Sequence, residues 1–139
     1  MGNGSPIRVL IVAYRTAATP RLLDAVRARA QRDPCSFTLL LPRPYWDPDT
    51  EEAALTLELA IPLLEDATAG HVEGIVGDSD PFLAVKEALE RERFDEVIVS
   101  TLPEHVSHWL RRDLPHRIKE LGVPVTVVTA KRSERSIPG

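Results

Sequence analysis

The segment from residue 100 to 112 carries the side chains of this chain that are best suited to binding chemistry, and it contains no glycine. Arg111 and Arg112 stand side by side, and two neighbouring guanidinium groups can hold phosphate or carboxylate oxygens through charge-assisted hydrogen bonds. The alternative is a pair of surface arginines in ion pairs with Glu104 or Asp113. Both interpretations fit the sequence, and they predict different partners for the two arginines.

Histidines in the same region suggest a metal site, but the ligand set is incomplete. His105, His108 and nearby His116 have no cysteine and no well-placed carboxylate beside them, and Pro103 and Pro115 are expected to make the segment irregular. We predict solvated loop histidines and no bound metal.

Carboxylates and hydroxyls offer two weaker signals. The two carboxylates of the turn at residues 77–80 could hold a cation, but a turn followed by a helix cap is the simpler interpretation. Ser100 and Ser107 lie near histidines in the sequence, a combination too common to define a nucleophile and its base. We expect no catalytic residues, so binding is favoured over an enzymatic activity, which stays open.

Three aromatic side chains fall in predicted loops. Tyr45, Trp46 and Trp109 could stack on a planar ligand, or they could fold down onto the ends of the strands. We predict that Trp109 and Leu110 fill space that a ligand would otherwise occupy.

The composition of the 139-residue chain is that of an ordinary globular protein. Its content is 43% hydrophobic and 27% charged, and its formal net charge of −4 makes a general nucleic-acid binder improbable. No apolar run approaches the roughly 18 residues of a membrane helix. The single Cys35 precludes an internal disulfide and fits a reducing compartment. We expect a cytoplasmic protein without membrane insertion.

The elements that must position these residues alternate along the chain. Short apolar runs rich in β-branched residues predict five strands, and amphipathic stretches opened by a cap residue or an early proline predict the helices between them. The strands are expected at residues 7–13, 37–41, 71–76, 95–99 and 124–129. The helices are expected to be capped by Thr19, by Asp80 or Ser79, and by Asp113, the second helix to open at Thr50 to Glu52, and the last to run to about Leu121 and stop at Gly122.

Five alternations of strand and helix predict an α/β domain with a parallel sheet and helices on both faces. Residues 7–130 would form this single domain, after a flexible start at residues 1–6 and before a polar tail at residues 131–139. Ligands of such sheets bind at the carboxyl ends of the strands. The loops that hold the unusual side chains all follow strands, so we expect these side chains at one end of the sheet.

At this point the sequence resembles the universal stress proteins over nearly its whole length, from Ile7 to Thr129. The resemblance rests on "RVLIVAYRTAATPRLLDAV", on "GDSDPFLAVKEAL", and on "FDEVIVSTL" with "LGVPVTVV" at the end. It implies a Rossmann-like sheet of order 3-2-1-4-5, with the reversal of strand order between the first and fourth strands. Many members of the family bind ATP there, through an Asp after the first strand and the motif G-x2-G-x9-G-S/T after the fourth.

This chain departs from the family at those points. Tyr14 stands where the Asp would be, Ser100 to Pro103 replace the first glycines, and Arg111-Arg112 fall near the final Gly-Ser. The pattern "DEVIVSTLPxxxSxWLRRDLPxR" is similar to a subgroup of stress-protein-like domains, some of which are tails of bacterial amino-acid permeases. Without glycines the backbone cannot approach phosphates closely, so we expect no cofactor and no tight ATP binding. A small anionic ligand remains compatible with the arginines.

The candidate ligand site comprises residues at the ends of the first, third and fourth strands and in the segment that follows. They are Tyr14, Arg15, Thr16, Gly77, Asp78, Ser100, Thr101, Trp109, Arg111 and Arg112. The leading hypothesis is a binding or regulatory module without the family's ATP binding. A non-standard nucleotide or phosphate binder, possessing at most weak hydrolase activity, and a structural dimerisation module are the alternatives.

The last strand supplies the dimer hypothesis. In the implied order it lies at an edge of the sheet, and Val125, Val127 and Thr129 belong to a stretch without charge that could pair with a second copy. The resemblance implies the same, because universal stress proteins commonly dimerise through this strand. The alternative is that the tail from Lys131 covers the edge.

Overall fold

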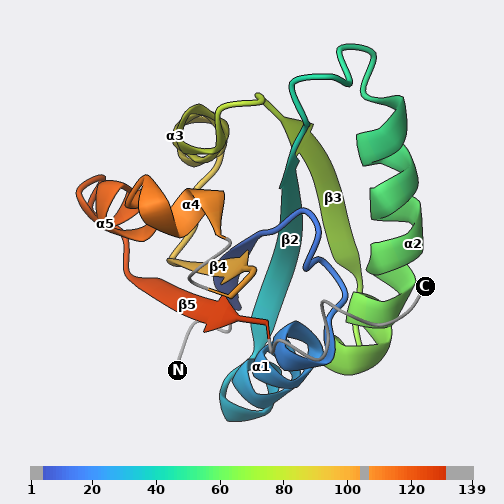
Figure 1. Cartoon of the computed structure of the whole chain (residues 1–139). Helices are drawn as coiled ribbons and strands as arrows, with labels where there is room; N and C mark the ends of the chain where they lie inside the picture. Colours follow the sequence, from blue (N-terminus) through green and yellow to red (C-terminus); the bar gives the residue numbers. More distant parts are fainter. Residues whose placement is uncertain (1–4, 104–106, 131–139) are drawn as a thin grey trace.

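The structure, a computed structural model, describes residues 5–103 and 107–130. Its centre is a parallel sheet of five strands in the order β3-β2-β1-β4-β5, which confirms the predicted topology. The strands are β1 (Ile7–Val12), β2 (Cys35–Pro42), β3 (Val72–Gly77), β4 (Glu96–Thr101) and β5 (Val125–Thr129). Both β3 and β5 lie at edges, and the order reverses between β1 and β4 (Figure 1).

Helices cover both faces of the sheet, as predicted (Figure 1). Two of them, α1 and α2, pack on one face, and α3, α4 and α5 lie over the other. Their bounds are α1 (Pro20–Arg32), α2 (Glu51–Thr68), α3 (Pro81–Arg91), α4 (His108–Arg111) and α5 (Leu114–Lys119).

The uninterrupted apolar run of β1 is explained by burial on both faces. Val9 and Ile11 point into the core beneath α1 and α2, while Leu10 and Val12 point into the core beneath α3 and α5. All four side chains are fully buried. Because a central parallel strand has no solvent face, its sequence shows no alternation of apolar and polar residues.

The helix caps differ in part from those predicted. Asp80 caps α3 as expected, since its carboxylate accepts hydrogen bonds from the backbone N–H groups of Phe82 and Leu83 at 2.9 and 3.4 Å. The predicted starts of three other helices were right, since Thr19, Thr50 and Asp113 take the N-cap positions of α1, α2 and α5, but none of these side chains makes a cap hydrogen bond.

The start of α2 is held by a residue that precedes it in the loop. The carboxylate of Asp47 accepts a 3.0 Å hydrogen bond from the backbone N–H of Ala53, and Asp47 is itself buried. Thr50 instead adopts the left-handed backbone conformation, with φ of 59°. Cap patterns assume that the chain enters a helix in extended conformation, and that assumption fails at this position.

The inward face of α2 includes only some of its large apolar residues. Leu57 and Ile61 pack towards the core, but Leu55, Leu59 and Leu63 are exposed. Apolar residues surround most of this helix, so periodicity did not select one face. Contact with β3 determines which face of α2 packs inward. Ile61 lies so close to Gly74 that a Cβ atom on Gly74 would be 2.5 Å from Cδ1 of Ile61.

The segment after β4 is more regular than predicted. Residues 108–111 form one helical turn, α4. Its start is held by a 3.1 Å hydrogen bond from the backbone N–H of Leu110 to Oγ of Ser107. The last helix, α5, ends at Lys119, earlier than expected, and Gly122 follows with the positive φ of 94° that its type permits. The predictions for Glu104, His105 and the tail lie outside the described residues.

Candidate binding site

The site lies at the carboxyl ends of β1 and β4, where the strand order reverses. Two adjoining cavities open there, with volumes of about 410 and 480 Å³. We name them the arginine cavity and the hydroxyl cavity after the residues that distinguish them. Both are lined by Tyr14, Arg15, Tyr45, Trp46, His108 and Trp109. The place where the strand order reverses, the topological switch point, is where α/β sheets bind ligands, and in this protein it contains both cavities.

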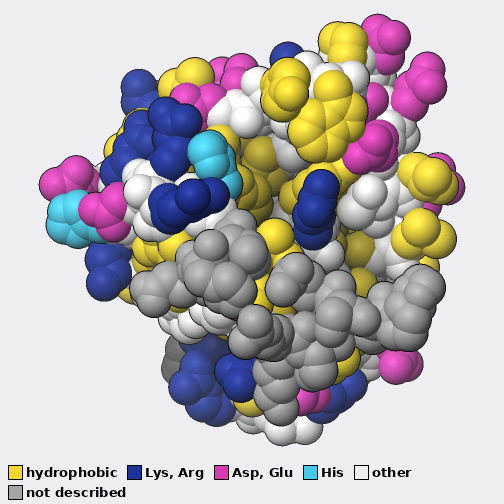
Figure 2. Space-filling view, in the orientation of Figure 1, with side chains coloured by type: hydrophobic (Ala, Val, Ile, Leu, Met, Phe, Trp, Pro, Cys, Tyr) yellow, Lys and Arg dark blue, Asp and Glu magenta, His cyan; other side chains and the backbone are white. Residues whose placement is uncertain are grey.

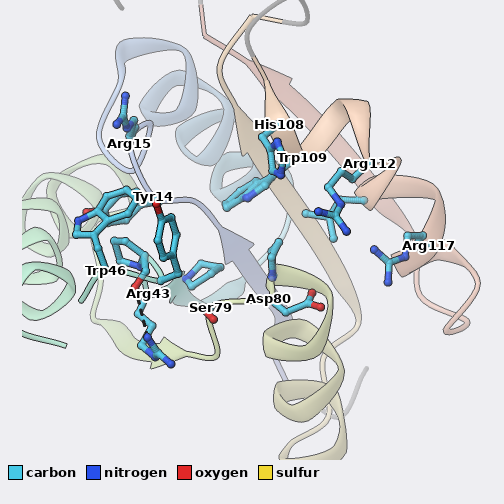
Figure 3. A pocket seen from close by; sticks show the side chains of 15 residues that line it. Tyr14, Arg15, Arg43, Trp46, Ser79, Asp80, His108, Trp109, Arg112 and Arg117 are labelled. Atoms are coloured by element: carbon cyan, nitrogen blue, oxygen red, sulfur yellow. Dashed lines mark hydrogen bonds between the residues drawn. The ribbon is translucent and has the colours of Figure 1, made fainter. Parts of the chain in front are cut away.

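The arginine cavity, of about 410 Å³, collects four cations from separate segments of the chain. Arg15 follows β1, Arg43 follows β2, Arg112 follows α4 and Arg117 belongs to α5. In Figure 3, Arg112 and Arg117 lie on one side of the cavity and Arg15 and Arg43 on the other, with Trp109 between them.

These four guanidinium groups have few partners within the described residues. None of them makes an ion pair there, whereas Arg8, Arg27, Arg29 and Arg93 all do. The one hydrogen bond of Arg43 is a long 3.4 Å contact with the carbonyl of Pro44. Arg117 lies 4.4 Å from the ring centroid of Phe82, a cation–π contact that leaves its N–H donors available.

The acidic side chain of the cavity does not neutralise this charge. Asp80 is the lining residue that carries a carboxylate, and one of its oxygens already caps α3. Like charges held near one another raise the local electrostatic potential and favour a bound anion. The arginine cavity can therefore attract phosphate or carboxylate groups.

The hydroxyl cavity has a polar floor where β1 and β4 end. Oγ1 of Thr16 and Oγ of Ser100 lie 2.6 Å apart, and both residues are buried. Thr101 is also buried, and its Oγ1 atom has no hydrogen-bond partner among the residues that the structure describes. A buried hydroxyl without a partner costs free energy, so this atom can bind a polar group that enters the cavity.

Glu52, in the first turn of α2, fixes two of the aromatic walls. The hydroxyl of Tyr14 donates to one of its carboxylate oxygens, and Nε1 of Trp46 donates to the other at 3.3 Å. Burial, followed by the hydrogen bond and charge of Glu52, raises the pKa of Tyr14 to about 12. Tyr14 therefore stays a neutral hydroxyl at physiological pH and contributes an aromatic surface.

The remaining aromatic residues occupy different positions. Tyr45 is 82% and Trp46 53% exposed, so they do not fold down onto the strand ends. Their rings meet edge to face, with centroids 5.2 Å apart. Trp109 is half-buried against the core beneath α3 and α5, and it lines both cavities. It fills only part of the space at the switch point, because a cavity remains on each side of it.

The structure brings together most of the residues that the sequence singled out. Seven of them line the two cavities: Tyr14, Arg15, Thr16, Ser100, Thr101, Trp109 and Arg112. Arg111 is exposed and lines neither cavity, so the neighbouring arginines do not converge on one site. Arg112 converges instead with Arg117 from the following helix.

Gly77 and Asp78 lie apart from this site. They line a separate cavity of about 130 Å³ beside α3. Asp78 accepts a 2.8 Å hydrogen bond from the N–H of Asp80 within the turn. At Gly77 a Cβ atom would meet Ala84 and Leu40, so glycine is required there for the packing of α3 on the sheet.

Sequence reasoning missed Arg43 and Arg117. Arg43 is the first residue after β2, and the rule that selected the loops after β1 and β4 applies to it equally. Arg117 gave no comparable signal, because it reaches the cavity only through the angle between α4 and α5.

The described residues contain neither a metal-binding cluster nor a membrane-spanning helix. In residues 5–103 and 107–130, no group of three or more His, Cys, Asp or Glu side chains is placed to hold a metal ion. Within the same ranges, none of the helices combines the length and the apolar composition needed to cross a bilayer.

Comparisons with known proteins identify the fold. The sequence matches no family model and no curated protein. The structure is similar to a universal stress protein from Archaeoglobus fulgidus in complex with dAMP, at TM-score 0.65 and 15% identity over 89% of this chain and 98% of that one.

Two further structures carry nucleotides as well. A universal stress protein family protein from Arabidopsis thaliana with AMP bound aligns at TM-score 0.64 and 13% identity, over 93% of this chain and 95% of that one. A universal stress protein in complex with cAMP aligns at TM-score 0.61 and 17% identity, over 91% and 100% of the two chains. At these identities the likeness shows that the chain has the universal stress protein fold.

Proposed function

We propose that this chain is a binding module of the universal stress protein type whose ligand is a small molecule with a planar ring and an anionic group. The observation that carries the proposal is the arginine cavity, which is lined by four arginines from different segments that make no ion pairs among the described residues. Nucleoside monophosphates belong to this ligand class, and the three similar structures contain dAMP, AMP and cAMP.

The two cavities suit the two parts of such a ligand. A planar ring in the hydroxyl cavity would contact Trp109 and Tyr14, and could donate a hydrogen bond to the unpartnered Oγ1 of Thr101. The anionic group would lie in the arginine cavity, held by the guanidinium forks of Arg112 and Arg117. Side chains would thus replace the backbone N–H groups of the family's glycine motif.

The same replacement argues against tight ATP binding. Residues 100–103 end β4 and include Pro103, which has no N–H to offer a triphosphate. Arg112 is exposed in the structure, so holding its side chain on a phosphate costs conformational entropy. We expect an ATP affinity no better than the high micromolar range, or about 5–6 kcal/mol.

A role in binding or regulation is favoured over catalysis. The hydroxyls of Thr16 and Ser100 bond to each other, and neither has a neighbouring base among the contacts of the described residues. We propose a cytoplasmic location, which a single free cysteine fits, and burial raises the pKa of the Cys35 thiol and keeps it protonated and unreactive. Membership of the universal stress protein family, and the likeness to permease tails, form part of this proposal.

The proposal is tested by the stabilising effect of inorganic phosphate. If phosphate binds with a dissociation constant of about 1 mM, about 20 mM phosphate adds roughly 1.8 kcal/mol to the free energy of unfolding. For a chain of this size that corresponds to a rise of about 5 °C in melting temperature, compared with chloride at equal ionic strength.

Variants separate a specific site from a general salt effect. Replacing Arg112 and Arg117 together by Gln should abolish the difference between phosphate and chloride. Arg111→Gln is the matched control, because it removes a neighbouring exposed charge that lines neither cavity, and it should leave the difference unchanged. An equal response in the double variant and in wild type would show that the arginine cavity binds no anion.

We also propose that the chain forms a homodimer through β5. Among the described residues, β5 pairs only with β4, so one edge of the strand is open. Val127 is 40% exposed at this edge, and no residue from Val125 to Thr129 carries a charge. Uncharged edge strands are templates for pairing, and a two-fold axis would close both edges at once. This association is independent of the proposed ligand.

A further inference from the structure

The outer surface of α2 carries a stripe of exposed leucines. Leu55, Leu59 and Leu63 are 56%, 67% and 48% exposed and recur at every fourth residue, so they form one ridge along the helix. Soluble helices usually place such a ridge against the core. In α2 the core contacts are made by other side chains, including Leu57 and Ile61. These three residues, the leucine stripe, are therefore an apolar surface that folding of the chain does not bury.

Exposed aromatic rings extend the stripe at one end. The indole nitrogen of Trp46 is bonded to Glu52 in the first turn of α2, which places this half-exposed ring beside the start of the helix. Tyr45 packs edge to face on Trp46 and is the most exposed of the large apolar residues. Contiguous apolar surface of this kind marks interaction sites more often than scattered single residues do.

The charged residues of α2 and of the segments next to it in the sequence are acidic. Between Arg43 and Lys86 the sequence contains ten Asp or Glu residues and no Lys or Arg. Of the exposed acidic residues of α2, Glu51 and Glu58 lie along one flank of the leucines, and Glu52 and Asp66 lie in line with them towards the two ends of the helix. Figure 2 shows hydrophobic and acidic side chains interspersed along the edge of the molecule formed by α2, whereas Lys and Arg gather over α3, α4 and α5 and at the lower end over α1.

We propose that this surface binds a basic amphipathic helix of a partner protein. A ridge of leucines at a spacing of four residues fits the groove of a second helix, and the carboxylates beside the ridge and at its ends select Lys or Arg next to the apolar face of the partner. The partner helix would run along α2, whose 18 residues span about 27 Å. Charge complementarity would raise the association rate and exclude acidic helices.

Two other occupants fit the surface less well. A second copy related by a two-fold axis would place the acidic residues of one α2 against those of the other, and the like charges would repel each other. The chain's own residues 131–139 are basic, but they contain a single aliphatic side chain, Ile137. One such side chain cannot cover three leucines and a tryptophan.

The test uses the full-length protein and a designed peptide. A fluorescein-labelled peptide of about 18 residues, with Leu along one face and Lys on both flanks, matches the length of α2. Its binding is followed by fluorescence anisotropy, next to a scrambled peptide of the same composition. We expect the patterned peptide to bind at least tenfold more tightly than the scrambled one, and binding to weaken when NaCl rises from about 50 to about 500 mM.

Variants assign the binding to α2. The triple substitution L55Q/L59Q/L63Q should weaken binding at least tenfold, and E51Q/E58Q/D66N should remove most of the salt dependence. The matched controls are L83Q/L121Q and E87Q/E90Q, which change exposed residues of the same types elsewhere and should leave binding within about twofold. Gln is a good helix former, so α2 should persist, and L59Q by itself serves if the triple variant is unstable.

Four results would overturn the proposal. The patterned peptide could fail to bind, could bind no better than the scrambled one, or could bind L55Q/L59Q/L63Q as well as wild type. Tight binding that develops only after residues 131–139 are removed would identify the tail as the natural occupant. The phosphate response should survive in L55Q/L59Q/L63Q, so this test and that of the arginine cavity fail independently.

Discussion

Adding a single methyl group at Gly77 should destabilise the fold without affecting the arginine cavity. An ideal Cβ at this position would lie 2.8 Å from Cβ of Ala84 and 2.9 Å from Cδ1 of Leu40. Both neighbours are almost completely buried, at 2% and 1% exposure, so neither can move into solvent. Overpacking of this kind costs typically 1–3 kcal/mol, and we expect about 2 kcal/mol for Gly77→Ala.

Urea denaturation measures this change directly. For a domain of this size, a loss of about 2 kcal/mol lowers the urea midpoint by roughly 1 M with no change in slope. Ala84→Gly removes one of the two close contacts. It should cost about 1 kcal/mol in the wild-type background, because glycine disfavours a helix, and less in the Gly77→Ala background.

The double variant makes the reasoning refutable. If the cause is steric, the effects of the two substitutions should fall short of additivity by at least about 0.5 kcal/mol. Strict additivity, or a neutral Gly77→Ala, would show that the space beside Gly77 adapts freely. The folded Gly77→Ala variant should keep the full stabilisation by phosphate. Loss of the phosphate response would show that Gly77 contributes to the ligand site after all.

Two further predictions concern pH and assembly. The N–H of Arg8 and the guanidinium of Arg93 lower the pKa of Asp95 in the folded protein, so Asp95→Ala should cost about 1–2 kcal/mol near neutral pH. The deficit should shrink as pH falls below the unfolded-state value of about 4, because the unfolded chain then binds the proton first; a deficit that persists at low pH would contradict this assignment. Val127→Lys puts a charge on the open edge of β5, and light scattering should find wild-type dimers and variant monomers at tens of micromolar. A monomeric wild type would refute this dimer, and an unchanged variant dimer would place the interface elsewhere.

The strands of the sheet were predictable from the sequence because each is a short apolar run between residues that interrupt regular secondary structure. The run at residues 7–13 lacks alternation, which by itself indicates a strand buried on both faces. The order of the strands in the sheet could not be predicted in the same way. It followed from the family resemblance and not from periodicity, since five strand–helix alternations are compatible with several parallel orders.

The directions in which individual side chains point were less predictable than the strands, and the structure shows why. Leu55, Leu59 and Leu63 could not be assigned to a face because α2 is apolar almost all round, and the side chains that pack inward, Leu57 and Ile61, are those that meet Gly74 on the following strand. Adjacent Arg111 and Arg112 were read as one unit, but neighbouring residues of a helical turn point in different directions. Arg117 became a site residue only when α5 packed beside α3.

A calorimetric titration of nucleotides tests the ligand site most directly. AMP, cAMP, dAMP and ATP are each titrated into the wild type, into the variant with Arg112 and Arg117 replaced by Gln, and into Arg111→Gln. We predict that at least one monophosphate binds the wild type with a dissociation constant below about 1 mM, an affinity above roughly 4 kcal/mol, and that ATP binds no tighter than the high micromolar range. The double variant should lose at least tenfold in affinity, and Arg111→Gln less than twofold. Low-micromolar ATP binding, or a monophosphate affinity that is equal in the wild type and the double variant, would contradict the account.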